Sequence, residues 1–177
     1  EIGRALEKGV SFDFNGTEVI VDHTKDTLKD IHNQFNSKRE AARAEYENSA
    51  EYKAYKIERA AKVASNNVKI AAMVDDLPNV LKAGEASTMN WLKAYTALAD
   101  DIDVDKKLDK VIESLTNAGY SKKDSSYDRE TTKVTANVMA RYIAGNALSC
   151  MKDGMPPHPV LATFVEKYFQ LQAQEQT

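Results

Sequence analysis

Residues 57–77 read IERAAKVASNNVKIAAMVDDL, and the spacing of their apolar side chains decides the fold class. These side chains recur at intervals of three or four residues and form two adjacent stripes. The first stripe is Ile57, Ala61, Ala64, Val68 and Ala71, and the second is Ala60, Val63, Asn67, Ile70, Val74 and Leu77. Because an α-helix turns once every 3.6 residues, the two stripes together make one broad apolar face. This pattern predicts a core helix of a helical bundle.

The composition of the whole chain points to the same class. The 177 residues include 23 alanines but only 7 glycines and 4 prolines, and alanine is the strongest helix former. The length is that of one domain. Lysine and arginine total 24 against 27 aspartates and glutamates, a formal charge of −3. This near-balance argues against a nucleic-acid binder with a basic surface and against an acidic DNA mimic.

A β-hairpin is predicted near the N-terminus, at about residues 10–21. Two alternating segments flank Asn15-Gly16, a dipeptide that favours a two-residue turn because both residues adopt positive φ. The register of this turn pairs Val10 with Val21, Phe12 with Val19 and Phe14 with Thr17. An isolated two-stranded ribbon is marginal in water, so its apolar face is expected to pack on helices or on a partner. Its open edges could also extend the sheet of a partner protein.

The rest of the chain reads as helical. The predicted helices span about 24–76 with at least one break, a short segment between Pro78 and Gly84, then 86–100, 104–118, 127–152 and 160–171. We therefore predict a mainly α fold, an irregular bundle of six or seven helices with an N-terminal β-hairpin. One helical domain is expected over residues 1–177, with a linker at 120–126 and a flexible tail at 172–177. Because the chain begins at Glu1, we expect it to be cut from a longer one.

Capping residues in the first half of the chain predict where one helix begins and where it breaks. Thr24 is the expected N-cap of the first helix, with Asp26 in its first turn. An unbroken helix over 24–76 would be about 80 Å long, more than the diameter of a domain of this size. A break is therefore expected, and capping-box spacings occur at Ser37 and at Asn48.

The sequence shows no clear catalytic or metal-binding constellation. His23 and His32 lie among aspartates, but a separation of nine residues does not place two ligands on one helical face. His158 stands between prolines in a turn. Cys150 falls on an apolar helical stripe, which predicts a buried small hydrophobe rather than a nucleophile. We favour a non-catalytic protein and predict neither a metal nor another cofactor.

The location of the protein is predicted from its single cysteine and its hydropathy. Cys150 cannot form an intramolecular disulfide, which indicates a reducing compartment and favours the cytoplasm. The longest charge-free stretches, such as residues 142–151, are far shorter than the ~20 residues that span a bilayer. We therefore expect no membrane partner.

Residues 37–62 combine many charges with three tyrosines. Basic and acidic residues alternate there, which is typical of a solvated helix face. Tyr46, Tyr52 and Tyr55 lie among these charges, where they could pack on a neighbouring helix or stack on nucleic-acid bases. We favour packing on a neighbouring helix.

We predict that the chain is a protein-binding module, an adaptor, inhibitor or regulatory protein, and that it self-associates. The candidate binding residues are Phe12, Phe14, Tyr46, Tyr52, Tyr55 and Asn67. Asn67 is included because a polar residue in a coiled-coil seam fixes register and partner number. One alternative is a nucleic-acid-binding protein that uses residues 37–62 with Lys122 and Lys123. The other is an enzyme or small-ligand binder with a pocket between helices, near Trp91, Tyr142 and His158.

Overall fold

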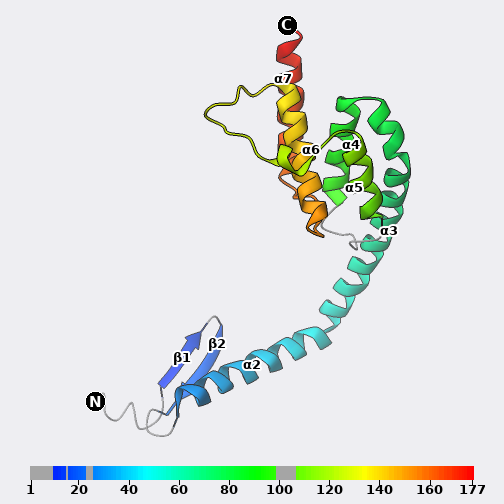
Figure 1. Cartoon of the computed structure of the whole chain (residues 1–177). Helices are drawn as coiled ribbons and strands as arrows, with labels where there is room; N and C mark the ends of the chain where they lie inside the picture. The colour runs from blue at the N-terminus through cyan, green and yellow to red at the C-terminus, as the bar shows by residue number, and fades with distance from the viewer. Residues whose placement is uncertain (1–9, 15, 23–25, 99–106) are drawn as a thin grey trace. The chain divides into compact units, whose positions relative to one another are not determined.

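The computed structural model describes residues 10–14, 16–22, 26–98 and 107–177 (Figure 1). Within these residues a two-stranded hairpin is followed by six α-helices and one short 3-10 helix, η2. The elements are β1 (Val10–Phe14), β2 (Thr17–Val21), α2 (Leu28–Asn48), α3 (Ala50–Lys82), α4 (Glu85–Leu98), α5 (Leu108–Asn117), η2 (Lys122–Ser125), α6 (Ala136–Lys152) and α7 (Leu161–Glu175). The predicted fold class, mainly α with an N-terminal β-hairpin, is confirmed.

The chain divides into two compact units, Glu1–Glu58 and Arg59–Thr177. We call them the N-terminal unit and the helical unit, and α3 contributes residues to both. The prediction of one helical domain over 1–177 is not tested by this division and stays a prediction.

The hairpin has the predicted register. β1 and β2 are antiparallel, with Val10 opposite Val21, Phe12 opposite Val19 and Phe14 opposite Thr17. Gly16 has a φ of 77°, a value that glycine adopts without a steric penalty. Its N–H donates to Asp13 Oδ1 over 2.8 Å, which closes the turn. Asn15, the other predicted turn residue, lies outside the described residues.

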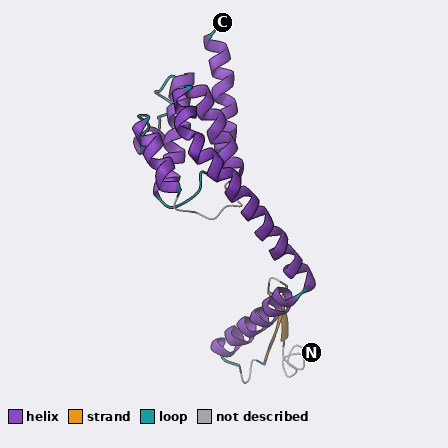
Figure 2. Ribbon diagram, turned by 90° about the vertical axis from the view of Figure 1, so that its right-hand side faces the viewer, coloured by secondary structure: helices purple, strands orange, loops and turns teal. Residues whose placement is uncertain are grey.

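Helix α2 lies along the hairpin and covers the outer edge of β2 (Figure 2). The Ile20 N–H donates to Gln34 Oε1 (2.8 Å), and Gln34 Nε2 donates to the Ile20 carbonyl (3.1 Å). Lys38 Nζ donates to the Glu18 carbonyl (2.8 Å). These side chains satisfy backbone groups that an edge strand leaves unpaired. At these positions the edge of β2 is closed, contrary to the expectation of open edges.

Helix α2 begins later than the sequence predicts. Thr27 is its N-cap: the Thr27 side chain accepts from the Asp30 N–H, and the Asp30 carboxylate accepts from the Thr27 N–H over 2.9 Å. This reciprocal capping box satisfies two donors at once. Asp26, expected in the first turn, therefore precedes the helix. Thr24, the predicted cap, lies outside the described residues.

A single residue, Ser49, separates α2 from α3. Its backbone is extended, with φ −61° and ψ 152°. Its N–H donates back to the Tyr46 carbonyl (3.0 Å), and its hydroxyl accepts from the Tyr52 N–H (3.0 Å), so it caps both helices. The break occurs one residue after Asn48, one of the two predicted places. At Ser37, the other place, α2 continues without a break.

Helix α3 runs through Pro78, so the prediction of a separate short helix before Gly84 was wrong. An interior proline removes one helical hydrogen bond and usually ends or kinks a helix. Here the neighbouring side chains of Val74 and Leu77 are 4% and 0% exposed, and their burial stabilises the helical continuation. Gly84, with a φ of 103°, follows the helix end as predicted.

The hydrophobic core of the helical unit lies among α3, α4, α5, α6 and α7 (Figure 1). Its fully buried side chains include Leu77, Met89, Leu92, Val111, Leu115, Met139, Ile143, Leu148 and Val165. Trp91 stacks on Tyr95 with 5.0 Å between ring centroids, and its Nε1 donates to the Met73 carbonyl over 2.9 Å. This hydrogen bond joins α4 to α3.

Helix α6 begins at Ala136 and not near residue 127. Asp128 resembles a first-turn acid in the sequence, but its carboxylate accepts from the Thr131 hydroxyl (2.6 Å) and closes a local turn. Thr135, whose hydroxyl accepts from the Val138 N–H (3.3 Å), is the N-cap. The residues between are therefore a loop.

Helix η2 packs directly on α6. A Cβ atom placed on Gly145 would lie 2.6 Å from the carbonyl carbon of Asp124 and from the nitrogen of Ser125. Asn146 Nδ2 donates to the Ser125 carbonyl over 3.0 Å. The segment expected to be a linker, 120–126, is therefore held against a core helix.

Helix α7 continues past its predicted end near residue 171. It reaches Glu175, whose Oε1 accepts from the Ala136 N–H over 2.9 Å. This contact joins the last turn of α7 to the first turn of α6. Most of the predicted tail, 172–177, is therefore helical.

Candidate functional site

An apolar groove lies between the hairpin and the first half of α2. Its volume is about 690 Å³. Its lining residues are Asp13, Val19, Val21, Leu28, Ile31, His32 and Phe35. Val19 is buried, with 4% exposed, whereas Leu28 is 86% exposed. The apolar side chains that line the groove are therefore partly exposed to solvent, and the exposure is largest at Leu28 on α2.

Strand register and helix phase together create the groove. The two lining valines of β2 share one face because side chains alternate along a strand. Leu28, Ile31 and Phe35 share one face of α2 because they are spaced by three and four residues. The hydrogen bonds between Gln34 and Ile20 hold the two faces together. Periodicity predicts both faces, but it gives no signal for a contact between a side-chain amide and a backbone fourteen residues away.

The three predicted tyrosines meet at the junction of α2 and α3. The ring centroids of Tyr46 and Tyr52 are 5.0 Å apart, and those of Tyr52 and Tyr55 are 6.3 Å apart. Lys56 Nζ lies 5.9 Å from the centre of the Tyr52 ring. Tyr46 and Tyr55 are 53% and 50% exposed. The break at Ser49 brings Tyr46 of α2 against Tyr52 of α3, and Tyr55 lies three residues further along α3. We call the group the tyrosine cluster.

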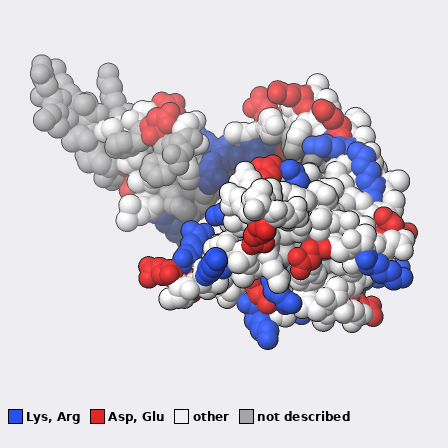
Figure 3. Space-filling view, turned by 90° about the horizontal axis from the view of Figure 1, so that it is seen from above, with Lys and Arg blue, Asp and Glu red and all other residues white. Residues whose placement is uncertain are grey.

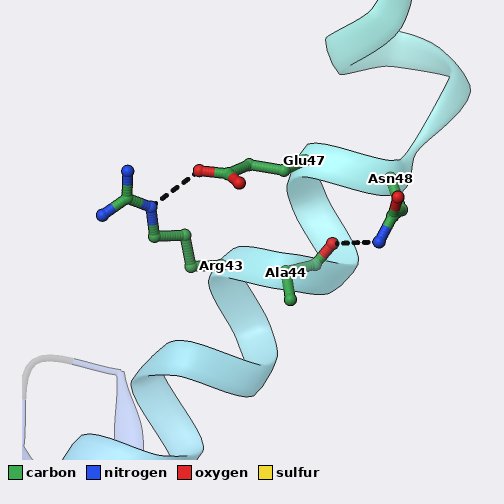
Figure 4. A network of polar contacts seen from close by, with 4 residues as sticks. All are labelled: Arg43, Ala44, Glu47 and Asn48. Atoms are coloured by element: carbon green, nitrogen blue, oxygen red, sulfur yellow. Dashed lines mark hydrogen bonds and ion pairs between the residues drawn. The ribbon is translucent and has the colours of Figure 1, made fainter.

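The basic residues beside the tyrosine cluster are engaged locally. Arg43 Nε donates to Glu47 Oε1 over 2.7 Å, one turn along α2, while Asn48 Nδ2 donates to the Ala44 carbonyl over 2.9 Å (Figure 4). The hydrogen bond and the charge of Glu47 raise the pKa of Arg43 above its usual value. The Arg39 guanidinium lies 5.5 Å from the centre of the Phe35 ring.

A surface hollow of about 520 Å³ adjoins these arginines on α2. Its lining residues are Asn36, Arg39, Glu40, Arg43 and Tyr46. Because an acid stands between the two arginines, the hollow is not a purely basic site for phosphate groups.

The other three predicted binding residues are Phe12, Phe14 and Asn67. Phe12 and Phe14 belong to β1, but their side chains are outside the described part of the structure. Asn67 on α3 is half-buried, and it is the preceding residue, Asn66, that is buried, with 5% exposed. The seam proposed for Asn67 contains Ile70, Val74 and Leu77, which pack in the core of the same chain. A binding role for these three residues stays a prediction.

A small cavity of about 190 Å³ lies in the helical unit where α3, α4, α6 and the segment after α5 meet. Its lining residues are Leu81, Gly84, Glu85, Thr88, Ala118, Gly119, Tyr120 and Arg141. Burial, followed by the charge of Glu85, raises the pKa of Tyr120 above its ordinary value. A phenol that keeps its proton beside a carboxylate and a guanidinium can hydrogen-bond a small polar molecule, but no activated nucleophile is present among the residues of this cavity.

The inter-helix pocket predicted near Trp91, Tyr142 and His158 does not coincide with any of these cavities. Trp91 is buried against Tyr95. Tyr142 makes an edge contact with Phe164, at 5.2 Å between centroids. His158 is exposed and its Nδ1 accepts from the Val160 N–H over 3.2 Å.

Cys150 is half-buried, less covered than the sequence predicts. The stripe to which it belongs includes Ile143 and Ala147, which are both 0% exposed. Cys150 therefore lies at the margin of the apolar face of α6 and not at its centre.

The charges of the helical unit do not form a basic surface on the face that Figure 3 draws, where lysine and arginine are interspersed with aspartate and glutamate. Lys122 Nζ lies 3.1 Å from Asp153 Oδ1, so one of the two lysines proposed for nucleic-acid contact is paired with an acid.

The described part of the chain contains neither a metal-ligand cluster nor a membrane-spanning helix. Within it, no group of three or more histidine, cysteine, aspartate or glutamate side chains is arranged to hold a metal ion. His23, part of the histidine–aspartate group considered from sequence, falls outside that part. None of the described helices combines the length and apolar character needed to cross a membrane.

Comparisons with known proteins identify no relative of this chain. No protein-family model matches the chain, and no curated protein or solved structure shows significant similarity to it.

Proposed function

We propose that the chain is a non-catalytic protein-binding module, an adaptor, inhibitor or regulatory protein, which binds through the groove between the hairpin and α2 and also self-associates. The observation that supports this most directly is that α2, a helix of 21 residues, contains no buried residue. Helices in proteins owe most of their stability to the packing of an apolar face. An apolar face of α2 that opens into a groove therefore suits a helix or strand of a partner.

The burial pattern of the N-terminal unit supports the same proposal. Among its described side chains, Val19 is the single buried hydrophobic residue. Leu28, which lines the groove, is 86% exposed, and Ile31 and Phe35 beside it in the groove are half-buried. Contiguous exposed apolar side chains on a soluble protein mark interaction sites. A cytoplasmic location is part of the proposal and rests on the single cysteine.

A photo-crosslinking amino acid at position 28 tests the groove directly. We expect the full chain with this substitution to crosslink to another polypeptide in its native cells, either a second copy or a different protein. The matched control carries the same amino acid at Asn33, an exposed position on another face of α2. Equal crosslinking from positions 28 and 33, or none from either, would overturn the groove as the binding surface.

Binding of single-stranded nucleic acid is a second candidate function, favoured by the tyrosine cluster. Aromatic rings stack on bases, and Lys56 beside Tyr52 supplies a positive charge. Fluorescence anisotropy with a single-stranded oligonucleotide separates the two functions. Nucleic-acid binding predicts an affinity that falls steeply with salt and that Tyr52→Ala weakens. No binding at low salt would exclude this candidate and leave the protein-binding proposal intact.

A further inference from the structure

Helix α3 carries a second apolar face, which points away from its own core. The residues of this face, which we call the outer stripe, are Ala50, Ala54, Ile57, Ala61, Ala64, Val68 and Ala71. They are separated by four and three residues in turn, the spacing of the a and d positions of a coiled coil. Ile57 and Val68 are the large side chains of the stripe, and each is 72% exposed.

The position of the outer stripe on the helix shows that the chain's own core does not cover it. At about 100° per residue the stripe lies on the side of α3 opposite Ile70 and Leu77, which are buried in the core. Moreover, the buried residues of α3 begin only at Asn66. The first sixteen residues of the helix, 50–65, therefore have no buried side chain to stabilise them, and isolated helices of this length are marginal in water.

We propose that the outer stripe pairs with the same stripe of a second copy of this chain, as a parallel two-stranded coiled coil. The inference rests on the self-association in the proposed function and assigns it a surface. In this pairing Ile57 meets Ile57 of the partner subunit, and Val68 meets Val68 of the partner subunit. The intervening alanines let the two helices approach closely, because interaxial distance depends on the side chains at the contact.

The charges that flank the outer stripe select the parallel orientation. In a parallel pair a g residue faces the e residue of the next heptad on the other helix, which places Lys53 beside Glu58 of the partner subunit. Two such ion pairs form by symmetry. The remaining e and g positions after Glu58 hold Ala60, Ser65, Asn67, Ala72 and Val74, so no like charges meet there. An antiparallel pair sets e against e and g against g, and it forms no ion pair of this kind.

Both ends of the outer stripe are defined. The next position of the repeat after Ala71 is Asp75, whose carboxylate would be costly to bury in a seam. The preceding repeat position lies beyond the break at Ser49. The proposed seam is therefore limited to residues 50–71 of α3.

Sedimentation equilibrium of the full chain tests the seam. We expect a concentration-dependent dimer, whose dissociation constant rises by roughly 100-fold or more in the variant with Ile57→Glu and Val68→Glu, because carboxylates replace apolar contacts. The matched control is Lys69→Glu, an exposed position of α3 outside the stripe, which should dimerise as the original chain does. A monomer at all concentrations, or a dimer that the double variant leaves unchanged, would overturn the proposal.

Disulfide formation tests the orientation without disturbing the apolar contacts. In a background with Cys150→Ala, the single variant Ala54→Cys should form a disulfide-linked dimer, because the two residues meet in a parallel, in-register pair. An antiparallel pair centred between Ala61 and Ala64, in which a positions face d positions, would instead link Ala54→Cys to Ala71→Cys in a mixture of the two chains. Crosslinking confined to that mixture, or absent from both, would overturn the parallel pairing even if the double glutamate variant failed to fold.

A charge exchange gives a third readout and separates this inference from the proposed function. Lys53→Glu and Glu58→Lys should each weaken the homodimer, roughly tenfold, and an equimolar mixture of the two should form the heterodimer preferentially. No preference in the mixture would contradict the assigned ion pairs. If the chain is monomeric but still crosslinks to another protein from position 28, the seam is wrong and the protein-binding function stands. If the dimer forms and position 28 crosslinks to nothing, the seam stands and the groove is wrong.

Discussion

At Gly145 the backbone of η2 approaches α6 so closely that no side chain fits. A Cβ atom there would meet backbone atoms of Asp124 and Ser125 at 2.6 Å, and backbone cannot rotate away as a side chain can. We predict that Gly145→Ala destabilises the fold by about 1–3 kcal/mol, the usual cost of overpacking, although alanine has a better helix propensity by ~1 kcal/mol. Thermal and urea unfolding measure this loss.

Asn137→Ala is the matched control for Gly145→Ala. Asn137 is exposed on the same helix, α6, so replacement by alanine changes helix propensity without a steric conflict. We expect its midpoint to stay the same or rise. An equal or higher midpoint for Gly145→Ala would show that η2 does not pack on α6 as described.

The buried tyrosines predict a loss of stability in alkali. Burial raises the pKa of Tyr95, and burial followed by Glu85 raises that of Tyr120, so both phenols hold their protons more tightly in the folded chain. Their contribution is fully present below the unfolded pKa of about 10 and is lost as the pH rises through the folded pKa. The unfolding midpoint should therefore fall above pH ~10. Tyr95→Phe should reduce this fall, and a fall of the same size in Tyr95→Phe as in the original chain would contradict the assignment.

Among single elements, the edge of β2 is covered by two side chains of α2, and at Ile20 it depends on Gln34. Gln34 pairs with both backbone groups of Ile20, as a neighbouring strand would. We predict that Gln34→Ala speeds amide exchange at Ile20 and costs about 1 kcal/mol, since it leaves a donor and an acceptor without a protein partner. Asn33→Ala, one residue away and exposed, is the control. Unchanged exchange at Ile20 would show that α2 does not cover this strand.

Local sequence signals determine the hairpin and most helices, whereas contacts between distant segments determine the boundaries that the sequence does not predict. The two-residue turn predicted at Asn15-Gly16 suffices to predict every pair of the hairpin. The passage of α3 through Pro78 depends on burial of Leu77 by other helices, and the extension of α7 depends on the contact of Glu175 with Ala136. Neither the burial of Leu77 nor the contact of Glu175 can be predicted from helix propensities and cap residues in the local sequence.

The candidate site was predictable to a similar degree. Tyr46, Tyr52 and Tyr55 were named as candidate binding residues from the sequence, but their contact with one another was not predicted, because it depends on the break at Ser49. The groove was not, since it requires the Gln34 contact between α2 and β2. The part of the outer stripe from Ile57 to Ala71 was recognised as a stripe, but it was predicted to belong to the buried face of a core helix. That prediction was wrong, because Ile57 and Val68 are each 72% exposed.

Over the whole molecule, burial is divided very unequally between the two units. The continuous core begins at Ile70 and ends at Tyr168, whereas the described part of the N-terminal unit buries one hydrophobic residue, Val19. Burial of an apolar side chain contributes about 1.5–3 kcal/mol, while ordering each residue costs ~1–2 kcal/mol of backbone entropy. The hairpin and α2 therefore cannot be stabilised by their own burial to the extent that the helical unit is.

This imbalance predicts how the chain behaves when it is divided at Ser49, the natural break between helices. We expect residues 50–177 to unfold cooperatively, with a midpoint within about 4 °C of the full chain, because they retain the core. A peptide of residues 1–49 should show much less helical circular dichroism alone than α2 contributes in the full chain. Its helicity should rise with concentration if a second copy supplies the missing apolar contacts, and scrambling the order of residues 28–48 should abolish that rise. Cooperative unfolding of a monomeric 1–49 peptide would show that this unit stabilises itself, and would remove the main physical reason for assigning it a partner.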